Sequence, residues 1–447
     1  MITIHVANQI TVDGLPENLA EKVQKSLTIE NKEFFKMQRL GIRVPLEFKY
    51  WKTDKNSALI IPRGCLGRIK RFLGANNVAV EWTEELVKNK RARHPSIGLE
   101  LRDYQKQIVD GIVDKRPTEG IINSSTGSGK TIMALEVING LQLSATVVTP
   151  NTVMLEQFIS ECEKFYGFTP AVIDSKRKEV GPLTIATFQS LMSNEELLER
   201  VASQTSVLII DEAQGIVSKE RRRVLKAFRP AHLFGLSATP ERGDGKTEAI
   251  NFLLGQEIAK YEATMCTPTV EIVRTNEELP MFADYHRMVE AMVESKSRNK
   301  LIAGLVVGEV LAGRKVLVLT KRIKHYVNLA EILPPNPGYH FIDAADPFRN
   351  RLLHDLKEGL VPFSVIFGTI SLLATGTDIP SLDTLIITCD IKSSVLTTQA
   401  AGRILRLFAG KPTPKIIDLY DNKHPIFSRQ FYERKRLYET KKWEIKM

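Results

Sequence analysis

The sequence has few cysteines and none of the segments that anchor or export a chain. Only four of its 447 residues are cysteine, and their scattered positions match neither a zinc-binding pattern nor a disulfide framework. No apolar run approaches the roughly 18 residues of a membrane span. The N-terminus lacks the basic-then-apolar layout of a secretion signal. These absences argue against a secreted, zinc-binding or membrane-embedded protein, and we expect a cytoplasmic one.

Acidic residues are also fewer than basic ones. The chain has 52 Asp and Glu against 62 Lys and Arg, which gives a formal net charge of +10. A large basic chain favours a polyanionic partner, with nucleic acid before a membrane surface. The same excess could serve solubility alone, so charge does not decide between these interpretations.

The length and the hydrophobic pattern predict several domains. Residues 1–95 mix strand-like and helix-like segments, which indicates a small α+β module. Residues 96–275 and 276–447 each alternate short apolar runs with helical patterns, as expected for two α/β lobes with parallel sheets. We expect strands at 120–122, 145–148, 183–186, 207–210 and 233–236, then at 315–319, 339–342, 364–367, 384–388 and 415–419. A connector is expected at 267–284 and a helical tail at 429–447.

A glycine-rich segment at 124–131 carries the strongest chemical signal. It follows an apolar run and opens a helical pattern, which is the context of a phosphate-binding loop. We expect Lys130 to reach the β- and γ-phosphates of ATP and Thr131 to ligate Mg²⁺. Ser124 stands where such loops usually have their first glycine. The other residues expected to hold the nucleotide here are Ser125, Thr126, Gly127, Ser128 and Gly129.

Two carboxylates follow the apolar run 207–210. A buried strand that ends in Asp211 and Glu212 is the arrangement that a Mg²⁺–nucleotide site needs. We expect Asp211 to hold the metal, directly or through water, and Glu212 to orient and deprotonate the attacking water.

Together these residues resemble superfamily 2 helicases and translocases over about residues 100–425, and further motifs of that family occur in order. The resemblance implies two tandem RecA-like lobes. It implies that Gln105, in Arg102-Asp103-Tyr104-Gln105, recognises adenine, and that Gly376 and Asp378 contribute to the nucleotide site. It also implies contacts to the nucleic-acid backbone from Pro150, Gln157, Thr187, Gln189, Thr320 and Thr369.

The segment 399–406 resembles motif VI of the same family and supplies Gln399, Arg403 and Arg406 as catalytic residues. The two arginines are three residues apart on an expected helix, so both guanidinium groups can face one side. The resemblance implies that they meet the γ-phosphate, and arginines in that role are worth roughly 10³–10⁵ in turnover.

Asp211-Glu212-Ala213-Gln214 and the segment 239–245 look more like the DNA-directed branch, which includes XPB-like helicases, restriction translocases and phage UvsW-type helicases. The resemblance implies an ATP-dependent motor that remodels forked, branched or duplex DNA, in the host cytoplasm if the chain comes from a phage. A duplex translocase without strand separation and an RNA helicase remain open. A non-catalytic binding protein is disfavoured because every expected catalytic position holds a chemically competent residue.

The module at 1–95 has a basic segment beside aromatic residues. Two interpretations are open: the basic residues position DNA phosphates while the aromatics stack on bases, or the aromatics form the module's core and the basic residues its solvated face. The residues concerned are Arg63, Arg68, Lys70, Arg71, Tyr50, Trp51 and Phe72.

Overall fold

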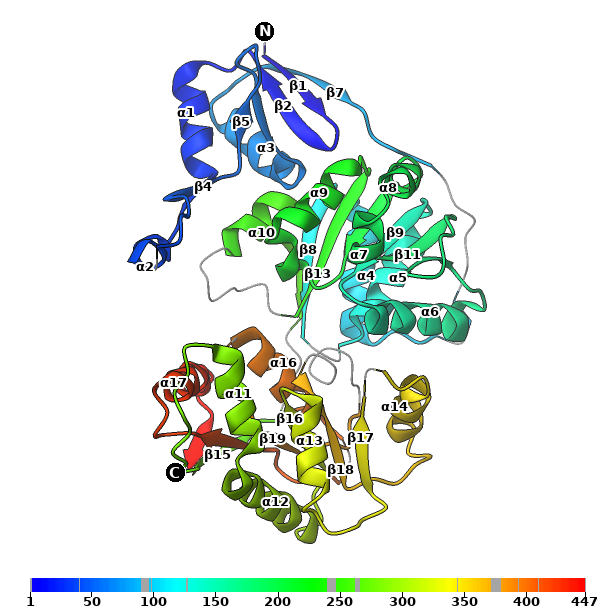
Figure 1. Cartoon of the computed structure of the whole chain (residues 1–447). Coiled ribbons are helices and arrows are strands. Elements are labelled where there is room, and N and C mark those ends of the chain that lie inside the picture. The colour runs from blue at the N-terminus through cyan, green and yellow to red at the C-terminus, as the bar shows by residue number, and fades with distance from the viewer. Residues whose placement is uncertain are drawn as a thin grey trace. The chain divides into compact units, whose positions relative to one another are not determined.

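Two seven-stranded sheets organise the chain in the computed structural model (Figure 1). The structure describes residues 2–39, 41–89, 96–97, 99–125, 128–238, 247–261, 266–343, 345–370, 379–392, 394–408 and 410–446. The chain divides into two units, Met1–Ala263 and Thr264–Met447. Among the described helices, none combines the length and apolar character needed to cross a membrane. The three-part division expected from the sequence stays a prediction.

The first unit begins with a mixed α+β module. Its elements are β1 (Ile2–Val6), β2 (Gln9–Asp13), α1 (Glu17–Ser26), β3 (Thr28–Glu30), α2 (Phe34–Arg39), β4 (Glu47–Lys49), β5 (Lys52–Thr53), β6 (Leu59–Pro62), the 3-10 helix η1 (Arg63–Cys65), α3 (Leu66–Ala75) and β7 (Val80–Glu84). Five strands form a sheet in the order β5-β6-β2-β1-β7, and β3 pairs with β4 in a separate hairpin. The alternating burial of β1 and β2 places one face of this sheet on the apolar core.

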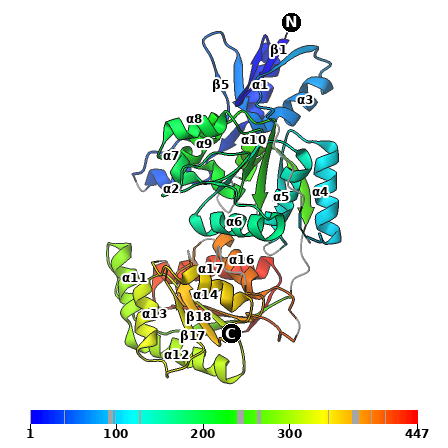
Figure 2. The same cartoon turned by 90° about the vertical axis from the view of Figure 1, so that its right-hand side faces the viewer.

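The rest of the first unit is a parallel sheet covered on both faces. Its elements are α4 (Asp103–Lys115), β8 (Glu119–Ser124), α5 (Lys130–Leu141), β9 (Ala145–Thr149), α6 (Thr152–Tyr166), β10 (Ala171–Ile173), β11 (Leu183–Thr187), α7 (Phe188–Met192), α8 (Glu195–Ala202), β12 (Val207–Ile210), the 3-10 helix η2 (Ala213–Val217), α9 (Lys219–Ala227), β13 (His232–Ser237), α10 (Thr247–Leu254) and β14 (Glu257–Tyr261). One apolar cluster joins the sheet to α4, α5 and α6, and another joins it to α7, α8, α9 and α10 (Figure 2). Both faces are covered, so the central strands β9 and β12 are buried along their whole length and do not alternate between buried and exposed residues.

The second unit repeats this architecture. It contains β15 (Thr269–Arg274), α11 (Tyr285–Glu294), α12 (Lys296–Leu311), β16 (Val316–Thr320), α13 (Ile323–Ala330), β17 (Tyr339–Ile342), α14 (Arg349–Lys357), β18 (Val365–Thr369), β19 (Thr384–Ile387), α16 (Ser394–Ile404), β20 (Lys415–Tyr420), α17 (Pro425–Thr440) and β21 (Glu444–Lys446). The strand orders are β10-β11-β9-β12-β13-β8-β14 and β17-β18-β16-β19-β20-β15-β21, which are the same order when each sheet is numbered from its own first strand. The predicted α/β fold with two tandem parallel-sheet lobes and an N-terminal α+β module is therefore confirmed.

Two expectations from the sequence are wrong in part. The expected connector at 267–284 contains β15, which pairs with both β20 and β21 inside the second sheet. The tail is helical only through α17, and β21 then adds an edge strand to the same sheet. β15 alternates apolar with polar and charged residues, and β21 has only three residues, so neither forms the continuous apolar run that marked the predicted strands.

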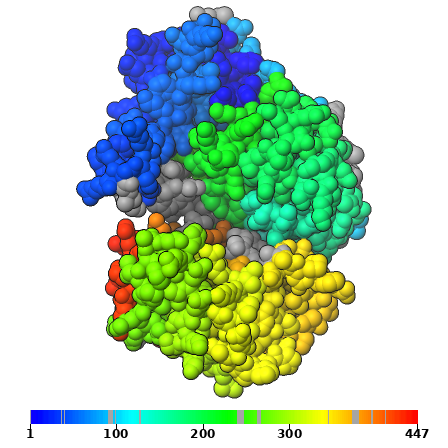
Figure 3. All heavy atoms as spheres, viewed as in Figure 1, coloured from blue at the N-terminus to red at the C-terminus, as the bar shows by residue number. Residues whose placement is uncertain are grey.

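The N-terminal module lies directly against the rest of the first unit (Figure 3). The two share one apolar cluster. At their contact the Arg63 guanidinium donates to Glu119 at 3.1 Å, and the Gly67 N–H donates to the same carboxylate at 2.7 Å. Arg63 and Glu119 are 3% and 7% exposed, so this is a buried ion pair. Arg63 therefore joins the module to β8 and is not available to position DNA phosphates.

The aromatic residues of the module also serve packing. Tyr50 is buried edge-on against Phe252 of α10, with the ring centres 5.4 Å apart. The Arg68 guanidinium lies over the same Phe252 ring at 4.9 Å. Trp51 is half-buried, and its indole N–H donates to the Thr28 hydroxyl at 3.0 Å. The core interpretation is thus correct for Tyr50, and Arg68 covers the joint between the module and the lobe.

Gly64 is expected to tolerate no side chain. A Cβ atom there would lie 2.5 Å from backbone atoms of Leu253, Leu254 and Gly255, none of which can move aside as a flexible side chain could. Gly64→Ala should therefore destabilise the first unit by about 1–3 kcal/mol. The control is Gly74→Ala, because a Cβ atom at Gly74 meets nothing within 4 Å. It should leave stability unchanged or raise it by up to about 1 kcal/mol. Urea denaturation of the two variants measures the difference, and equal midpoints would contradict the prediction.

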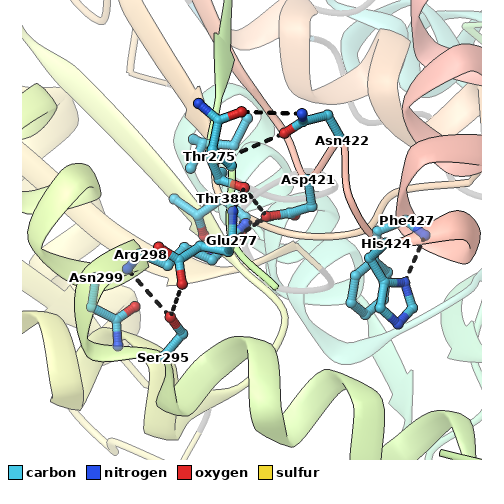
Figure 4. A network of polar contacts seen from close by, with 12 residues as sticks. Thr275, Glu277, Ser295, Arg298, Asn299, Thr388, Asp421, Asn422, His424 and Phe427 are labelled. Carbon is cyan, nitrogen blue, oxygen red and sulfur yellow. Dashed lines mark hydrogen bonds and ion pairs between the residues drawn. The ribbon is translucent and has the colours of Figure 1, made fainter. Parts of the chain in front are cut away.

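The second unit contains a buried polar network that ties three strands to α12 (Figure 4). Arg298 donates from Nε to Asp421 at 2.8 Å and from Nη2 to the Thr388 carbonyl at 2.8 Å. The Thr275 hydroxyl donates to the same carboxylate at 2.9 Å. Burial by itself would raise the pKa of Asp421, but the ion pair and hydrogen bonds of Arg298 outweigh it and lower this pKa. The network therefore fixes the residues that directly follow β15, β19 and β20.

Candidate functional site

The predicted phosphate loop connects β8 to α5, as its sequence context indicates. Ser124 ends the strand with no exposed surface, and its hydroxyl bonds to that of Ser128 across the loop. Gly129 has φ +79°, a left-handed conformation that favours glycine, and directly precedes the first helical residue, Lys130. Ser124, which stands where such loops usually have a glycine, therefore contributes a hydrogen bond between the two ends of the loop.

Residues of α4 hold the loop from the side. The carbonyl of Ser128 accepts hydrogen bonds from the Tyr104 hydroxyl and from the Gln105 side-chain amide, each at 2.8 Å. The side-chain oxygen of Gln105 accepts a hydrogen bond from the Arg102 backbone N–H at 3.0 Å and so caps α4. A Cβ atom at Gly129 would lie 2.4 Å from the Gln105 amide nitrogen. Gln105 thus supports the loop here, while its recognition of adenine stays a prediction.

The two residues predicted to act on phosphate and metal stand at the start of α5. The Lys130 ammonium donates to the Ser124 carbonyl at 2.9 Å. The Thr131 hydroxyl accepts from the Gln157 side-chain amide at 3.3 Å. Gln157, expected from the family resemblance to contact nucleic acid, therefore lies beside a predicted metal ligand, and its nucleic-acid contact stays a prediction.

The acidic pair lies where β12 ends. Asp211 is 6% exposed, and its carboxylate accepts from the Glu212 backbone N–H at 2.9 Å. Burial raises the pKa of Asp211 to about 7, the charge of Glu212 adds to this rise, and the charge of Lys130 opposes it. The charge of Lys130 therefore acts on Asp211, although their strands β8 and β12 are separated by β13 in the sheet.

Glu212 is held in an unusual backbone conformation and connected to the next strand. Its φ of 49° is left-handed, which is uncommon for a residue with a side chain and typical of functional sites. The Gln214 amide donates to the Glu212 carboxylate. The Gln214 carbonyl accepts from the Ser237 hydroxyl at 3.2 Å, at the end of β13. This chain of contacts connects the acidic pair to Ser237 at the end of β13.

Four of the residues expected to contact nucleic acid, Pro150, Thr187, Thr320 and Thr369, lie at the carboxyl ends of strands, where open parallel sheets bind ligands, whereas Gln157 and Gln189 lie on α6 and α7. Thr187 pairs with Thr149 at the ends of β11 and β9, and Thr369 pairs with Thr320 at the ends of β18 and β16. Because the two sheets have the same strand order, these are equivalent positions in the two lobes.

The immediate surroundings of these residues differ. Thr187 and Thr320 are buried, and Thr187 caps α7 by accepting from the Ser190 N–H. Pro150 and Thr369 are half-buried, whereas Gln189 is exposed. Gln157 is exposed as well. The nucleic-acid role of all six residues stays a prediction.

The motif VI residues lie on and just after α16. Gln399 and Arg403 are buried within the helix, at 5% and 8% exposure. The helix ends at Ile404, so Arg406 lies beyond it and the helical spacing predicted for the two arginines does not apply to Arg406. Burial lowers the pKa of Arg406 to about 10. Its carbonyl accepts from the Lys411 ammonium at 2.9 Å.

Four predicted site residues, Thr126, Gly127, Gly376 and Asp378, lie outside the described residues, as does the segment 239–245. Sequence reasoning also missed residues that shape the site. Tyr261 stacks on Tyr104 with ring centres 3.5 Å apart, and its carbonyl accepts from the Ser125 N–H at 3.0 Å. Tyr261 is distant in sequence from the loop, so only the pairing of β14 with β8 reveals it.

Comparisons with known proteins agree with this geometry. Residues 98–242 match the family model "Type III restriction enzyme, res subunit". The DNA 3'-5' translocase XPB2 of Sulfurisphaera tokodaii is 28% identical over 236 residues, which cover 46% of this chain and 53% of that protein. The ATP-dependent DNA helicase uvsW of Enterobacteria phage T4 is 21% identical and covers 89% of this chain and 88% of its own length. Residues 98–242 therefore carry a helicase domain of the type found in restriction enzymes, and the chain is a homologue of the XPB2 translocase and the uvsW helicase.

A solved structure supports the fold of this homologue. The fragment structure of a putative HsdR subunit of a type I restriction enzyme from Vibrio vulnificus covers 94% of this chain and 82% of its own, with a TM-score of 0.55 and 19% identity. At that identity the likeness concerns the fold alone. The chain spans about half the length of the XPB2 translocase, so the activity of the whole protein is a matter for proposal.

Proposed function

We propose that this protein is an ATP-dependent DNA helicase or translocase that remodels forked or branched DNA. The observation that carries the proposal is the convergence of Lys130, Asp211 and Glu212 at the carboxyl edge of one parallel sheet. There the charge of Lys130 reaches the buried carboxylate of Asp211. A cation for phosphate, a carboxylate for metal and a second carboxylate for water are the parts that nucleotide hydrolysis needs.

The residues fit a magnesium nucleotide. The Thr131 hydroxyl and the Asp211 carboxylate offer the oxygen ligands that Mg²⁺ prefers. When bound, Mg²⁺ would neutralise charge on the phosphate oxygens. The loop N–H groups and Lys130 would bind and orient the phosphates. Glu212, held by Gln214, would take the proton of the attacking water. Arg403 and Arg406 are proposed to stabilise the charge that develops on the γ-phosphate.

DNA is proposed over RNA because the printed names of the XPB2 and uvsW relatives both specify DNA. The net charge of +10 suits the phosphate backbone of either nucleic acid, and it predicts binding that weakens steeply with salt. The runner-up is a duplex translocase that moves without separating strands, because the name of the XPB2 relative specifies translocation and not unwinding.

ATP hydrolysis measured with different nucleic acids tests the proposal. We expect forked and branched DNA to raise the rate at least tenfold over the protein alone, linear duplex to raise it less, and RNA to have little effect. Unwinding of a labelled fork, measured beside triplex displacement on linear duplex, separates the helicase from the translocase. Stimulation by RNA alone would refute the DNA assignment, and no hydrolysis under any condition would refute the enzymatic one.

A further inference from the structure

The hairpin β3–β4 carries a short arm away from the five-stranded sheet of the N-terminal module (Figure 1). We define the arm as residues 31–46, which include α2. Its base is closed by Asn31, which donates from its backbone N–H to the Leu46 carbonyl and from its side chain to the Pro45 carbonyl, both at 2.8 Å. At the other end of the hairpin, the Trp51 indole N–H donates a hydrogen bond to the Thr28 hydroxyl. The arm is therefore an ordered projection and not a loose loop.

The arm exposes large apolar side chains from its tip to its base. Phe35, Ile42 and Leu46 are 68%, 50% and 54% exposed. Phe35 packs edge-on against the half-buried ring of Phe34, with the ring centres 5.3 Å apart. Phe34 therefore helps to hold the exposed Phe35 ring in place. Among the described residues, no helix or strand packs extensively against α2. Exposed apolar side chains of this size on a projecting arm indicate a contact surface.

Basic side chains surround these apolar ones. Lys32, Arg39, Arg43 and Lys49 are exposed on the arm and its hairpin. Over residues 31–49 the sequence has five Lys and Arg against two Glu. Exposed aromatics set among basic side chains are the combination that binds unpaired nucleic acid, since the cations hold phosphates while the rings stack on bases. The excess of positive charge matches the uniformly negative phosphate backbone of a nucleic acid.

The arm is also fixed relative to the ATP-binding sheet. The module that bears it is joined to β8 by the buried Arg63–Glu119 pair, and Gly64 lies against the backbone of residues 253–255. The strand β8 that carries Glu119 ends at Ser124 of the phosphate loop. A step taken by the first lobe along DNA would therefore move the arm with it, as an element that separates strands at a fork must move.

We propose that the arm at residues 31–46 is a nucleic-acid contact that engages the junction of forked DNA. Its basic side chains hold backbone phosphates, and Phe35 stacks on a base exposed where the strands part. This inference rests on the proposed function, because it takes DNA as the substrate.

The test uses the full chain with two variants and two matched controls. Phe35→Ala removes the stacking ring, and Arg39→Glu with Arg43→Glu reverses two charges on the arm. Phe348→Ala removes an equally exposed phenylalanine, at 70%, from the second unit. Lys22→Glu with Lys25→Glu reverses two exposed charges on α1 of the same module. Fluorescence anisotropy without nucleotide measures binding to a fork and to a blunt linear duplex over a range of salt, and thermal unfolding checks that each variant is folded.

We expect the double arm variant to bind the fork about tenfold or more weakly and to reduce the slope of log K against log salt by about two. Phe35→Ala should weaken fork binding at least about fivefold while blunt duplex changes less than twofold, because only the fork offers an unpaired base. Both controls should bind as the wild type does.

Three results would overturn the inference. Fork binding by both arm variants within twofold of wild type would assign the exposed side chains to a protein partner. An equal loss in the α1 control would mean that net charge alone acts. Equal losses of affinity for the fork and the blunt duplex in Phe35→Ala would show that Phe35 does not stack on an unpaired base. If the wild type bound no DNA and its hydrolysis ignored DNA, the proposed function itself would fail and this inference with it.

Discussion

Replacing Glu212 with Gln is expected to leave nucleotide binding intact and to lower the turnover of ATP hydrolysis by about 10²–10⁴. The amide keeps the size of the side chain and its ability to bond to Gln214, but it cannot take a proton from water. The backbone of Glu212 is already held in its left-handed conformation, so the substitution should not release the loop. Steady-state hydrolysis in the presence of forked DNA and equilibrium binding of a fluorescent ATP analogue measure the two effects separately.

Two further variants make this result specific. Lys130→Ala should weaken nucleotide binding itself, because it removes the cation expected to meet the phosphates. Glu220→Gln is the matched control, since Glu220 is an exposed carboxylate in the first turn of α9. It should hydrolyse ATP at the wild-type rate. Wild-type turnover in Glu212→Gln would remove this carboxylate from the mechanism.

Replacing Arg298 with Met is expected to destabilise the second unit by about 3–5 kcal/mol. The change leaves the Asp421 carboxylate buried with the Thr275 hydroxyl but without its cation. Hydrogen exchange of peptides from β15, β19 and β20 measures the local stability of the second unit. Urea denaturation of the full chain gives the free energy of unfolding. Replacing Asp421 with Asn in the same chain should recover part of the loss, since it removes the unpaired charge.

The exposed ion pair between Lys324 and Glu294 provides the control, with side chains 63% and 53% exposed. Lys324→Met should cost less than about 1 kcal/mol. The pH dependence gives a second check. Because Arg298 lowers the pKa of Asp421, the contribution of the pair is complete above the unfolded pKa of about 3.9 and is lost as the pH falls through the lower, folded value. A loss below 1 kcal/mol in Arg298→Met would contradict the buried-pair interpretation.

The sequence by itself determined most strands of the two parallel sheets and the order of the chemical motifs along the chain. The apolar runs became strands at the expected places, because a parallel sheet covered on both faces needs continuous apolar segments whatever else surrounds them. The loop before Lys130 and the carboxylates after Ile210 were found for a similar reason. A phosphate site and an acidic strand end each depend on residues that are adjacent in the chain, so local pattern is enough to reveal them.

Only the tertiary structure decided which residues act on one another across the chain. The basic Arg63 looked like a phosphate contact until its partner Glu119 and its burial were known. Tyr261 and Ser237 join the site through strand pairing and side-chain contacts that no spacing predicts. The arm at residues 31–46 is basic in the sequence, but only the structure shows that Phe35, Ile42 and Leu46 are exposed on it. Burial depends on the fold of the whole unit, which no single segment specifies.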